Sequence, residues 1–369
     1  MLRLLKIAHK LPIASLSGRA VSQNQIRCLF SREELGIVDF ARARTEVKKF
    51  LGNVEFYKAN FAHKFLNDED CFYEDLKNGL KDFIFIIENT ELDIVHLKEA
   101  LTLLAKKQNE YAGDKFRFGP VIMRALYYLD MPDEAIAMFE DDVIGQLFPQ
   151  FTSHQILFDM LYEHKMYEDI LRLYDNLNEE AQLYKFTTVI ILATYYQLNT
   201  PKSLEQAYSL WKKMTYKNDK HQFRKSLTFV AGLAIKQKQP KIALEVLRIY
   251  EDYPKNFYFA VREIKLLAWA QIGHYDKVLN MFRTILERHK QKQEKDQLTS
   301  IKTLDDIQEL VHINGIKQNI DEFLSLRNEI ETLKLVTDKT LDNTLCMPFP
   351  ARKSGGKFQN LSGVLNRQK

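Results

Sequence analysis

Glycine, proline and cysteine are scarce in this sequence. Its 369 residues include 13 Gly and 9 Pro, whereas Leu, Ile, Lys and Glu are abundant. An all-β protein needs Gly and Pro at its many turns, so this composition favours a mostly helical fold. The three cysteines, Cys28, Cys71 and Cys346, lie far apart and form no CxxC pair. We therefore expect neither a disulfide framework nor a structural zinc site.

Long apolar runs and catalytic motifs are also missing. No window offers the roughly 18 consecutive apolar residues that a membrane-spanning helix needs, so we expect no membrane span. GxSxG, HExxH, GxGxxG and a complete P-loop are absent, and the GGK at 355–357 lacks the other P-loop residues. His154 and His164 are not spaced as a pair of metal ligands. These absences predict a protein that is not an enzyme and that uses no metal ion or cofactor.

An acidic cluster between residues 130 and 142 leaves two interpretations. Carboxylates gathered in this way occur in metal-dependent nucleases, and they also occur on solvated helix faces. A separate nuclease domain of mixed α/β structure would show the alternating pattern of β-strands, and no such pattern follows residue 290. We favour an acidic outer helix face for this cluster, whose members are Asp130, Asp133, Glu134, Glu140, Asp141 and Asp142.

The N-terminal region lacks acidic residues altogether. The first 32 residues contain no Asp or Glu but six basic residues, namely Arg3, Lys6, Lys10, Arg19, Arg27 and Arg32. Basic residues mixed with Leu, Ile and Ser are typical of a mitochondrial presequence, and the apolar run is too interrupted for a secretory signal. We expect residues 1–30 to direct the chain to the mitochondrial matrix, with cleavage near Phe30. The alternative is a basic tail without a targeting role.

Phenylalanine recurs at a nearly constant interval. The leading residues of the five units are separated by 35, 35, 37 and 36 residues and are Phe116, Phe151, Phe186, Phe223 and Phe259. In each unit a small or branched apolar residue follows at a second fixed position, namely Ala135, Ile170, Ala207, Ala243 or Val278. A polar break separates the two halves of every unit. Helical hairpins of this length bury their apolar faces by stacking on copies of themselves. The pattern predicts an all-α fold, a right-handed α-solenoid of helical hairpins, rather than an ordinary helical bundle.

This period divides the chain into five parts. After the presequence at 1–30, residues 31–110 are expected to form N-terminal helices with a degenerate first hairpin. Residues 111–290 hold the five repeats, and residues 291–336 form C-terminal capping helices, because terminal units of an array are atypical. Residues 337–369 are basic overall and contain paired glycines, so we expect a flexible tail there.

Four stretches resemble the pentatricopeptide repeat family. The segment FTSHQILFDMLYEHKMYEDILRLYDNL at 151–177 is similar to its aromatic first helix, short turn and acidic second helix, and QIGHYDKVLNMF at 271–282 is similar to its glycine turn. The runs KFRFGPVIMRALYYLDMPDEA and VTDKTLDNTLCMPFPARK resemble an animal mitochondrial branch of the family, and this resemblance extends from about Phe72 to Arg352. The resemblance implies binding of single-stranded mitochondrial RNA, a role in its processing or maturation, and thereby in respiratory-chain function.

One part of the family pattern is not matched. In plant members, the fifth residue of each first helix is a small polar group that reads one base. The corresponding residues are Pro120, Gln155, Ile190, Leu227 and Glu263, of which only Gln155 has a side chain suited to that role. Decoding of one base by each repeat is therefore not expected.

Charge is distributed unequally between the two helices of the repeats. The expected first helices hold eight basic and three acidic residues, whereas the second helices hold seven basic and fourteen acidic ones. First helices line the inner surface of a solenoid, so this surface is the expected RNA track. Its candidate RNA-binding residues are Arg117, Arg124, Lys185, Arg224, Lys225, Arg262 and Lys265.

Aromatic residues near these cations are candidates for stacking on unpaired bases, namely Tyr184, Tyr195 and Phe257. The competing interpretation is that the cations lie on ordinary solvated helix faces and that the aromatics belong to the core. A second functional hypothesis is a protein-interaction scaffold associated with the mitochondrial ribosome. RNA-processing enzymes or the mitochondrial ribosome are accordingly the protein partners to consider.

Overall fold

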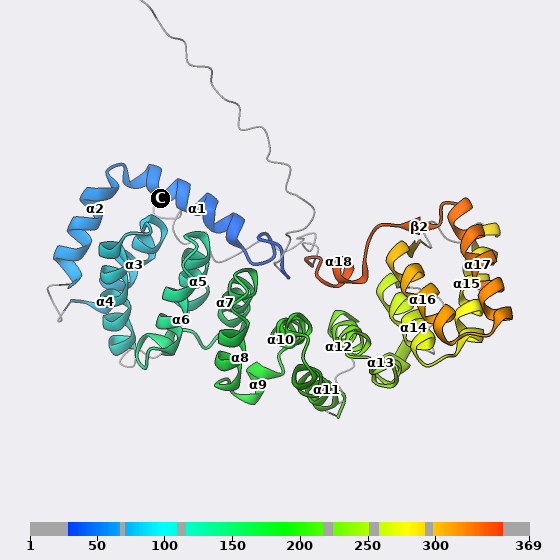
Figure 1. The fold of residues 1–369 in the computed structure, drawn as a ribbon. Helices are drawn as coiled ribbons and strands as arrows, with labels where there is room; N and C mark the ends of the chain where they lie inside the picture. Colours follow the sequence, from blue (N-terminus) through cyan, green and yellow to red (C-terminus); the bar gives the residue numbers. More distant parts are fainter. Residues whose placement is uncertain are drawn as a thin grey trace, which may run out of the picture.

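The described chain is almost entirely helical. The computed structural model describes residues 29–66, 71–108, 116–216, 224–250, 258–291 and 298–349. Within these ranges there are 18 α-helices and one pair of two-residue strands. The helices follow one another along a curved ribbon (Figure 1). The expected all-α solenoid is confirmed.

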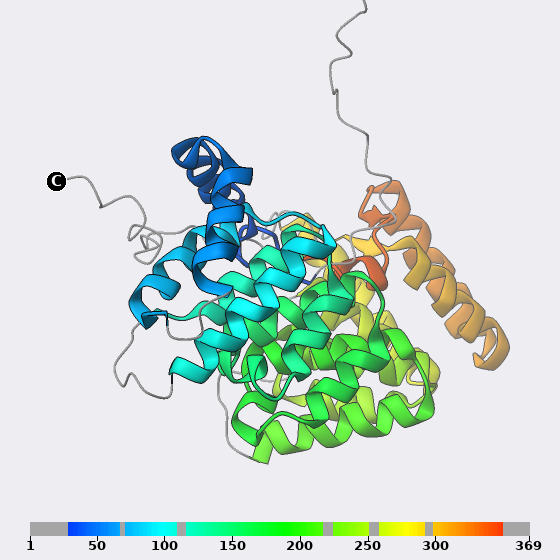
Figure 2. The same ribbon diagram turned by 90° about the vertical axis from the view of Figure 1, so that its left-hand side faces the viewer.

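Seven consecutive helical hairpins form most of the described ribbon. Their first helices are α3 (Tyr73–Ile86), α5 (Phe118–Tyr128), α7 (Phe151–Glu163), α10 (Lys185–Leu198), α12 (Arg224–Lys236), α14 (Phe259–Gln271) and α16 (Ile301–Asn314). Their second helices are α4 (Glu91–Gln108), α6 (Pro132–Glu140), α8 (Tyr167–Asp175), α11 (Pro201–Tyr216), α13 (Pro240–Val246), α15 (Tyr275–Lys290) and α17 (Lys317–Thr332). Each first helix packs on the first helix of the next hairpin. Figure 2, viewed from the N-terminal end, shows these helices side by side, with α17 projecting to one side.

Three short helical elements fill the connections between hairpins. The 3₁₀ helix η2 (Ile144–Leu147) lies between α6 and α7 and contacts both α4 and α6. The single-turn helix α9 (Glu179–Gln182) precedes α10, and the 3₁₀ helix η3 (Arg248–Tyr250) follows α13.

The recurring phenylalanines lie at the starts of the first helices. Helices α7 and α14 begin at Phe151 and Phe259, Phe186 is the second residue of α10, and Phe116 precedes α5 by two residues. Phe223 lies outside the described residues. The second recurring position is buried in every unit, with at most 1% of the residue exposed at Ala135, Ile170, Ala207, Ala243 and Val278. Residues of modest size at this position allow the second helix to approach the first, because interiors are packed without voids.

The turn between the two helices of a hairpin uses the same backbone conformation throughout the repeats. One residue in each turn has a positive φ, with values of 59°, 60°, 49°, 53° and 78° at Asp130, Lys165, Asn199, Lys238 and Gly273. A left-handed residue ends a helix by turning the chain back, and glycine is the residue best suited to it. Four of the five turns are thus made by residues for which this conformation carries a small strain.

The N-terminal helices cap one end of the array. Helix α1 (Ile37–Leu51) packs against α3 and α5, and it leads into α2 (Val54–Phe61) and a π-helical turn, η1 (Ala62–Leu66). Phe40 of α1 stacks on Phe85 at 5.0 Å between ring centroids. The guanidinium of Arg44, which is only 4% exposed, donates to the Phe85 carbonyl at 2.9 Å and pairs with Glu88 at 2.7 Å. The cap therefore buries an aromatic pair and satisfies its one buried arginine.

Two segments from the ends of the described chain cross the inner surface of the ribbon. The N-terminal segment, residues 29–36, runs from α1 towards α7 and α10. At the other end, β2 (Val336–Thr337) pairs in parallel with β1 (Thr299–Ser300). The C-terminal segment, residues 338–349, then carries α18 (Leu341–Leu345) back onto α12 and α14, inside the curve of Figure 1.

Part of the expected C-terminal tail packs on the array. Residues 337–349 were expected to belong to a mobile tail, but Leu345 in this stretch is only 2% exposed. A Cβ built on Gly232 would stand 3.0 Å from the Leu345 side chain, so the absence of a side chain at this glycine makes room for α18. Burial of an apolar side chain at this notch holds the segment on the array. Residues 350–369 and the expected presequence up to residue 28 lie outside the described residues.

Candidate nucleic-acid interface

The two terminal segments meet on the inner surface above α7 and α10. The Phe30 ring packs edge-on against Phe186 at 5.3 Å and stacks on Phe349 at 5.0 Å. The backbone N–H of Phe349 donates to the Leu29 carbonyl at 2.8 Å. Part of the surface expected to bind RNA is therefore covered by the protein itself, and Leu29 and Phe30 are fully buried there.

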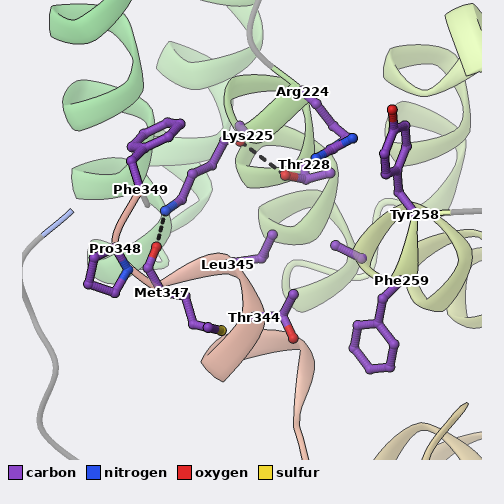
Figure 3. Close-up of a pocket in the computed structure, with 11 residues that line it drawn as sticks. Arg224, Lys225, Thr228, Tyr258, Phe259, Thr344, Leu345, Met347, Pro348 and Phe349 are labelled. Carbon is purple, nitrogen blue, oxygen red and sulfur yellow. Dashed lines mark hydrogen bonds between the residues drawn. The ribbon is translucent and has the colours of Figure 1, made fainter. Parts of the chain in front are cut away.

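A cavity of about 390 Å³ remains open beyond this covered region, between α12, α14 and the C-terminal segment. Figure 3 shows Arg224 and Lys225 of α12 on one side, Tyr258 and Phe259 at the start of α14 on another, and residues 344–349 closing the third side. The Arg224 guanidinium lies 3.3 Å from the centroid of the Tyr258 ring. The cavity thus combines cationic and aromatic groups at one place.

Lys225 joins the C-terminal segment to the cavity wall. Its Nζ donates to the carbonyl oxygen of Met347 and lies 4.5 Å from the centroid of the Phe349 ring. Helix α18 is held in addition by an ion pair of 2.8 Å between Asp342 and Lys236, and the Tyr196 hydroxyl donates to the same carboxylate. The lysine amine of Lys225 is therefore part of the wall, whereas the exposed arginine faces the opening.

The chemistry of the Arg224–Tyr258 pair suits an unpaired nucleotide. A guanidinium held over a tyrosine ring is oriented by the cation–π interaction. Its planar group stacks on bases, and its N–H groups donate to phosphate oxygens in a forked geometry. Thr228 lines the same cavity but its hydroxyl donates to the Lys225 carbonyl at 3.0 Å. The arginine and the tyrosine are accordingly the groups of this cavity best suited to contact a nucleotide.

The N-terminal ends of the inner helices add a positive potential along one edge of the array. Successive hairpins repeat the same order of helices, so the first helices run in the same direction. Helices α5, α7, α10, α12 and α14 carry no acidic residue in their first turns. The second helices α6, α8 and α15 do carry acids there. The unneutralised dipoles of the inner helices favour anions at this edge.

Four of the seven predicted RNA-binding residues belong to this edge. Arg117 is the N-cap residue of α5, Lys185 begins α10, and Arg224 and Lys225 begin α12. Arg117, Lys185 and Arg224 are exposed, and Lys225 is half-buried. Lys265 lies in the middle of α14 and is also half-buried. The structure thus brings Arg224 and Lys225 together at the cavity and places Arg117 and Lys185 at corresponding ends of other repeats.

Two of the predicted residues contact other parts of the chain. Arg124 donates through Nε to the Leu35 carbonyl at 2.8 Å and holds the N-terminal segment, and burial lowers the pKa of its guanidinium. Arg262 is 3% exposed, pairs with the fully buried Glu263 at 3.3 Å and donates to the Leu298 carbonyl. Sequence position alone does not distinguish such arginines, because an arginine on an inner helix also faces whatever chain segment crosses that helix.

The predicted stacking residues and Gln155 differ in their surroundings. Tyr195 is 6% exposed, and burial raises the pKa of its hydroxyl to about 12. Tyr184 is stacked on Phe151 at 4.5 Å, and Phe257 lies outside the described residues. Gln155 is only 7% exposed, so its side chain is not available to read a base. Tyr258 was missed, although the aromatic run at 257–259 before an inner helix was a usable signal.

The acidic cluster lies on hairpin turns and second helices and is used for contacts between neighbours. Glu134 of α6 pairs with Lys98 of α4, Glu140 pairs with Arg172 of α8, and Asp130 lies 2.7 Å from His164. Asp141 accepts from the backbone N–H groups that begin η2 at 2.9 and 2.7 Å. Within the described ranges no three His, Cys, Asp or Glu side chains gather as metal ligands, and no helix there is both long and apolar enough to cross a bilayer.

Comparisons with known proteins find several relatives that share one name. A mouse protein named pentatricopeptide repeat-containing protein 2, mitochondrial, is 29% identical over 196 residues, which are 53% of this chain and 50% of the relative. The human protein of that name is 22% identical over 81% of this chain and 78% of the relative. The Xenopus laevis protein is 28% identical over 44% of this chain and 43% of its own length. The mouse and frog alignments thus span half or less of those relatives.

No family model and no solved structure matches the chain. The fold is therefore established by the helices of the structure, and the sequence similarity is to pentatricopeptide repeat proteins that carry the word mitochondrial in their names.

Proposed function

We propose that this chain binds single-stranded mitochondrial RNA in the matrix, without catalysis, and thereby supports RNA processing or maturation and respiratory-chain function. The observation that carries the proposal is the cavity in which exposed Arg224 lies over Tyr258, on the inner surface of a helical-repeat array. The cation and the ring offer phosphate and base contacts at a single site. The names of the relatives support the mitochondrial setting.

The path of the RNA follows from the charges of the inner helices. From the cavity, the strand runs along the edge formed by the N-terminal ends of α12, α10 and α5, where Lys185 and Arg117 lie. Each phosphate neutralised at this edge releases counterions, which favours binding at low salt. The covered region above α7 forces the strand towards this edge and away from the middle of the inner surface.

Binding of a labelled single-stranded RNA to the purified full chain tests the proposal. Fluorescence anisotropy between about 50 and 200 mM salt should give an affinity that falls steeply with salt. Arg224→Ala and Tyr258→Ala should each weaken binding by about 5- to 150-fold, the range for loss of one stacking or ionic contact of about 1–3 kcal/mol. Arg224→Ala should also lower the salt dependence by about one phosphate contact, a slope change of about 0.7 for a single strand.

The control is Lys202→Ala, which removes an exposed cation from the start of the second helix α11, at the edge opposite the N-terminal ends of the first helices. It should leave RNA affinity within about twofold, because charges far from the contact contribute little. Equal losses from Arg224→Ala and Lys202→Ala would exclude the cavity as the contact. Weak binding of free RNA together with association with mitochondrial ribosomal particles would favour the alternative function, a protein-interaction scaffold.

A further inference from the structure

A fully buried carboxylate faces the first described residue of the chain. Asp159, in the middle of α7, has no exposed surface. Its Oδ1 accepts from the backbone nitrogens of Leu29 at 2.9 Å and Phe30 at 3.1 Å, and its Oδ2 accepts from the Tyr127 hydroxyl at 3.3 Å. Within the described residues, no Lys, Arg or His side chain forms an ion pair with it. The negative charge is therefore met only by neutral donors.

This arrangement leaves the charge of Asp159 incompletely compensated. Removing a carboxylate from water costs several kcal/mol unless a cation approaches it. The pKa of Asp159 is raised to about 7, mainly by burial and also by the neighbouring carboxylate of Glu163, while hydrogen bonds from the two backbone N–H groups and Tyr127 act to lower it. The Arg32 guanidinium lies 4.0 Å from the Glu163 carboxylate instead. A positive charge at the Leu29 nitrogen is the simplest way to complete the site.

We propose that the Cys28–Leu29 peptide bond is a proteolytic processing site and that the α-ammonium group of Leu29 pairs with Asp159 in the mature protein. Hydrolysis adds one water across the bond, so Cys28 keeps the new carboxylate and the Leu29 nitrogen takes the proton. A processing endopeptidase that removes basic N-terminal segments provides the catalysis. Because Leu29 is fully buried in the folded chain, cleavage precedes docking of the N-terminal segment.

The neighbouring bonds fit less well. A chain that begins at Phe30 also presents an amine to Asp159, but it lacks the Leu29 side chain and leaves an empty apolar space in the core. A chain that begins at Ser31 or later loses both nitrogens that contact the carboxylate. A chain with residues before Leu29 keeps an uncharged amide at this position. Leu29 is thus the start that completes the charge and keeps the packing.

The first test identifies the N-terminus directly. The full-length chain with a C-terminal tag is expressed in cells, purified from their mitochondria, labelled at free amines and digested for mass spectrometry. The expected first residue is Leu29 with a free α-amine. A first residue at any other position, or a chain that keeps its basic N-terminal segment, overturns the proposal. This result is independent of RNA binding, so failure here does not affect the proposed function.

The second test measures the ion pair. One chain is released from a fusion so that it begins at Leu29, and another begins at Cys28. Urea unfolding near pH 7 should give the first chain an unfolding equilibrium constant at least tenfold smaller. In the Asp159→Asn background this difference should disappear, whereas the matched change Glu163→Gln should retain it. Equal behaviour of the two chains with Asp159 intact overturns the ion pair.

The pH dependence supplies a further readout. The advantage of the chain that begins at Leu29 should diminish above about pH 8, where an unperturbed α-amine loses its proton, with a midpoint moved upward by pairing. The charged and titratable groups that face the pair are Glu163 on α7, Tyr127 on α5 and Arg32 on the N-terminal segment. An advantage that does not change between pH 7 and 10 contradicts an ammonium–carboxylate pair.

Discussion

Leu345→Ala should release the C-terminal segment from the inner surface without unfolding the array. Leu345 is 2% exposed and fills the space left by Gly232, so its truncation removes buried methyl groups and creates a cavity. Such changes cost about 2–5 kcal/mol. The remaining ion pair between Asp342 and Lys236 is partly exposed and contributes about 0.2–1 kcal/mol. The segment should therefore open locally at least about 30-fold more often, because 1.4 kcal/mol is a factor of ten.

Hydrogen–deuterium exchange with mass spectrometry measures this opening. The amides of Thr344 and Cys346 are bonded to the carbonyls of Thr340 at 3.1 Å and Asp342 at 2.9 Å, so they report on α18 directly. The control is Leu324→Ala on α17, where the leucine is 39% exposed and its truncation should change exchange little. Unchanged exchange over residues 338–349 refutes the anchoring role of Leu345. Equal acceleration in α5 and α12 refutes the conclusion that the segment opens as a separate unit.

Three other predictions concern the turns, the buried ion pair and the buried carboxyl. Gly273→Ala should lower the free energy of unfolding by about 1 kcal/mol in urea titrations, because a Cβ there meets no atom within 4 Å and only the backbone is strained. Lys165→Ala at the equivalent turn should change it little, since both residues carry a Cβ at a φ of 60°, and an equal loss at the two sites contradicts this account. Arg262→Met should cost about 3–5 kcal/mol in thermal unfolding because it strands Glu263, and adding Glu263→Leu should recover most of it; no recovery refutes the pairing. In the uncleaved full-length chain the Asp159 carboxyl has a pKa of about 7, above its ordinary 3.8. The folded chain then holds a proton that the unfolded chain has lost, so stability should fall between pH 4 and 7 relative to Asp159→Asn, and a rise over that range contradicts the burial.

The sequence was sufficient to predict the repeating part of the fold. An aromatic residue every 35 to 37 positions marks the start of the first helices, and the buried residues at the second position mark where helices approach. Both signals are local and periodic, so they are visible without knowing which hairpins touch. The hairpin turns were predictable as breaks, but only Gly273 among the five indicated their left-handed conformation in advance.

The covering of the inner surface was not predictable in the same way. Phe30 and Phe349 are separated by most of the chain, and their stacking depends on the curvature of the ribbon between them. Arg124 and Arg262 are positively charged, as RNA-binding residues are. Arg124 donates to the Leu35 carbonyl, however, and Arg262 donates to the Leu298 carbonyl and pairs with Glu263. Counting charged residues by helix predicts which surface is basic. Whether a given cation on that surface is exposed depends on the chain segments that cross it.

The cavity is the part of the candidate site that was best predicted from the sequence. Arg224 and Lys225 were predicted from the basic charge of the first helices, and both line the cavity. Tyr258 of the next repeat completes the cavity, where it lies under the Arg224 guanidinium. A count of charged residues does not find it, because tyrosine is uncharged. A search for an aromatic residue just before each inner helix finds it, because such residues lie at the same edge as the first-turn cations.

Photocrosslinking of a 4-thiouridine-labelled single-stranded RNA to the purified full chain, with the adducts mapped by mass spectrometry, tests the central claim most directly. The account predicts adducts at Tyr258 and Phe259 and on the peptide that begins α12, all of which line the cavity. It also predicts that Tyr258→Ala removes the main adduct. Adducts confined to the second helices, or centred on α7 beneath the N-terminal segment, would contradict it.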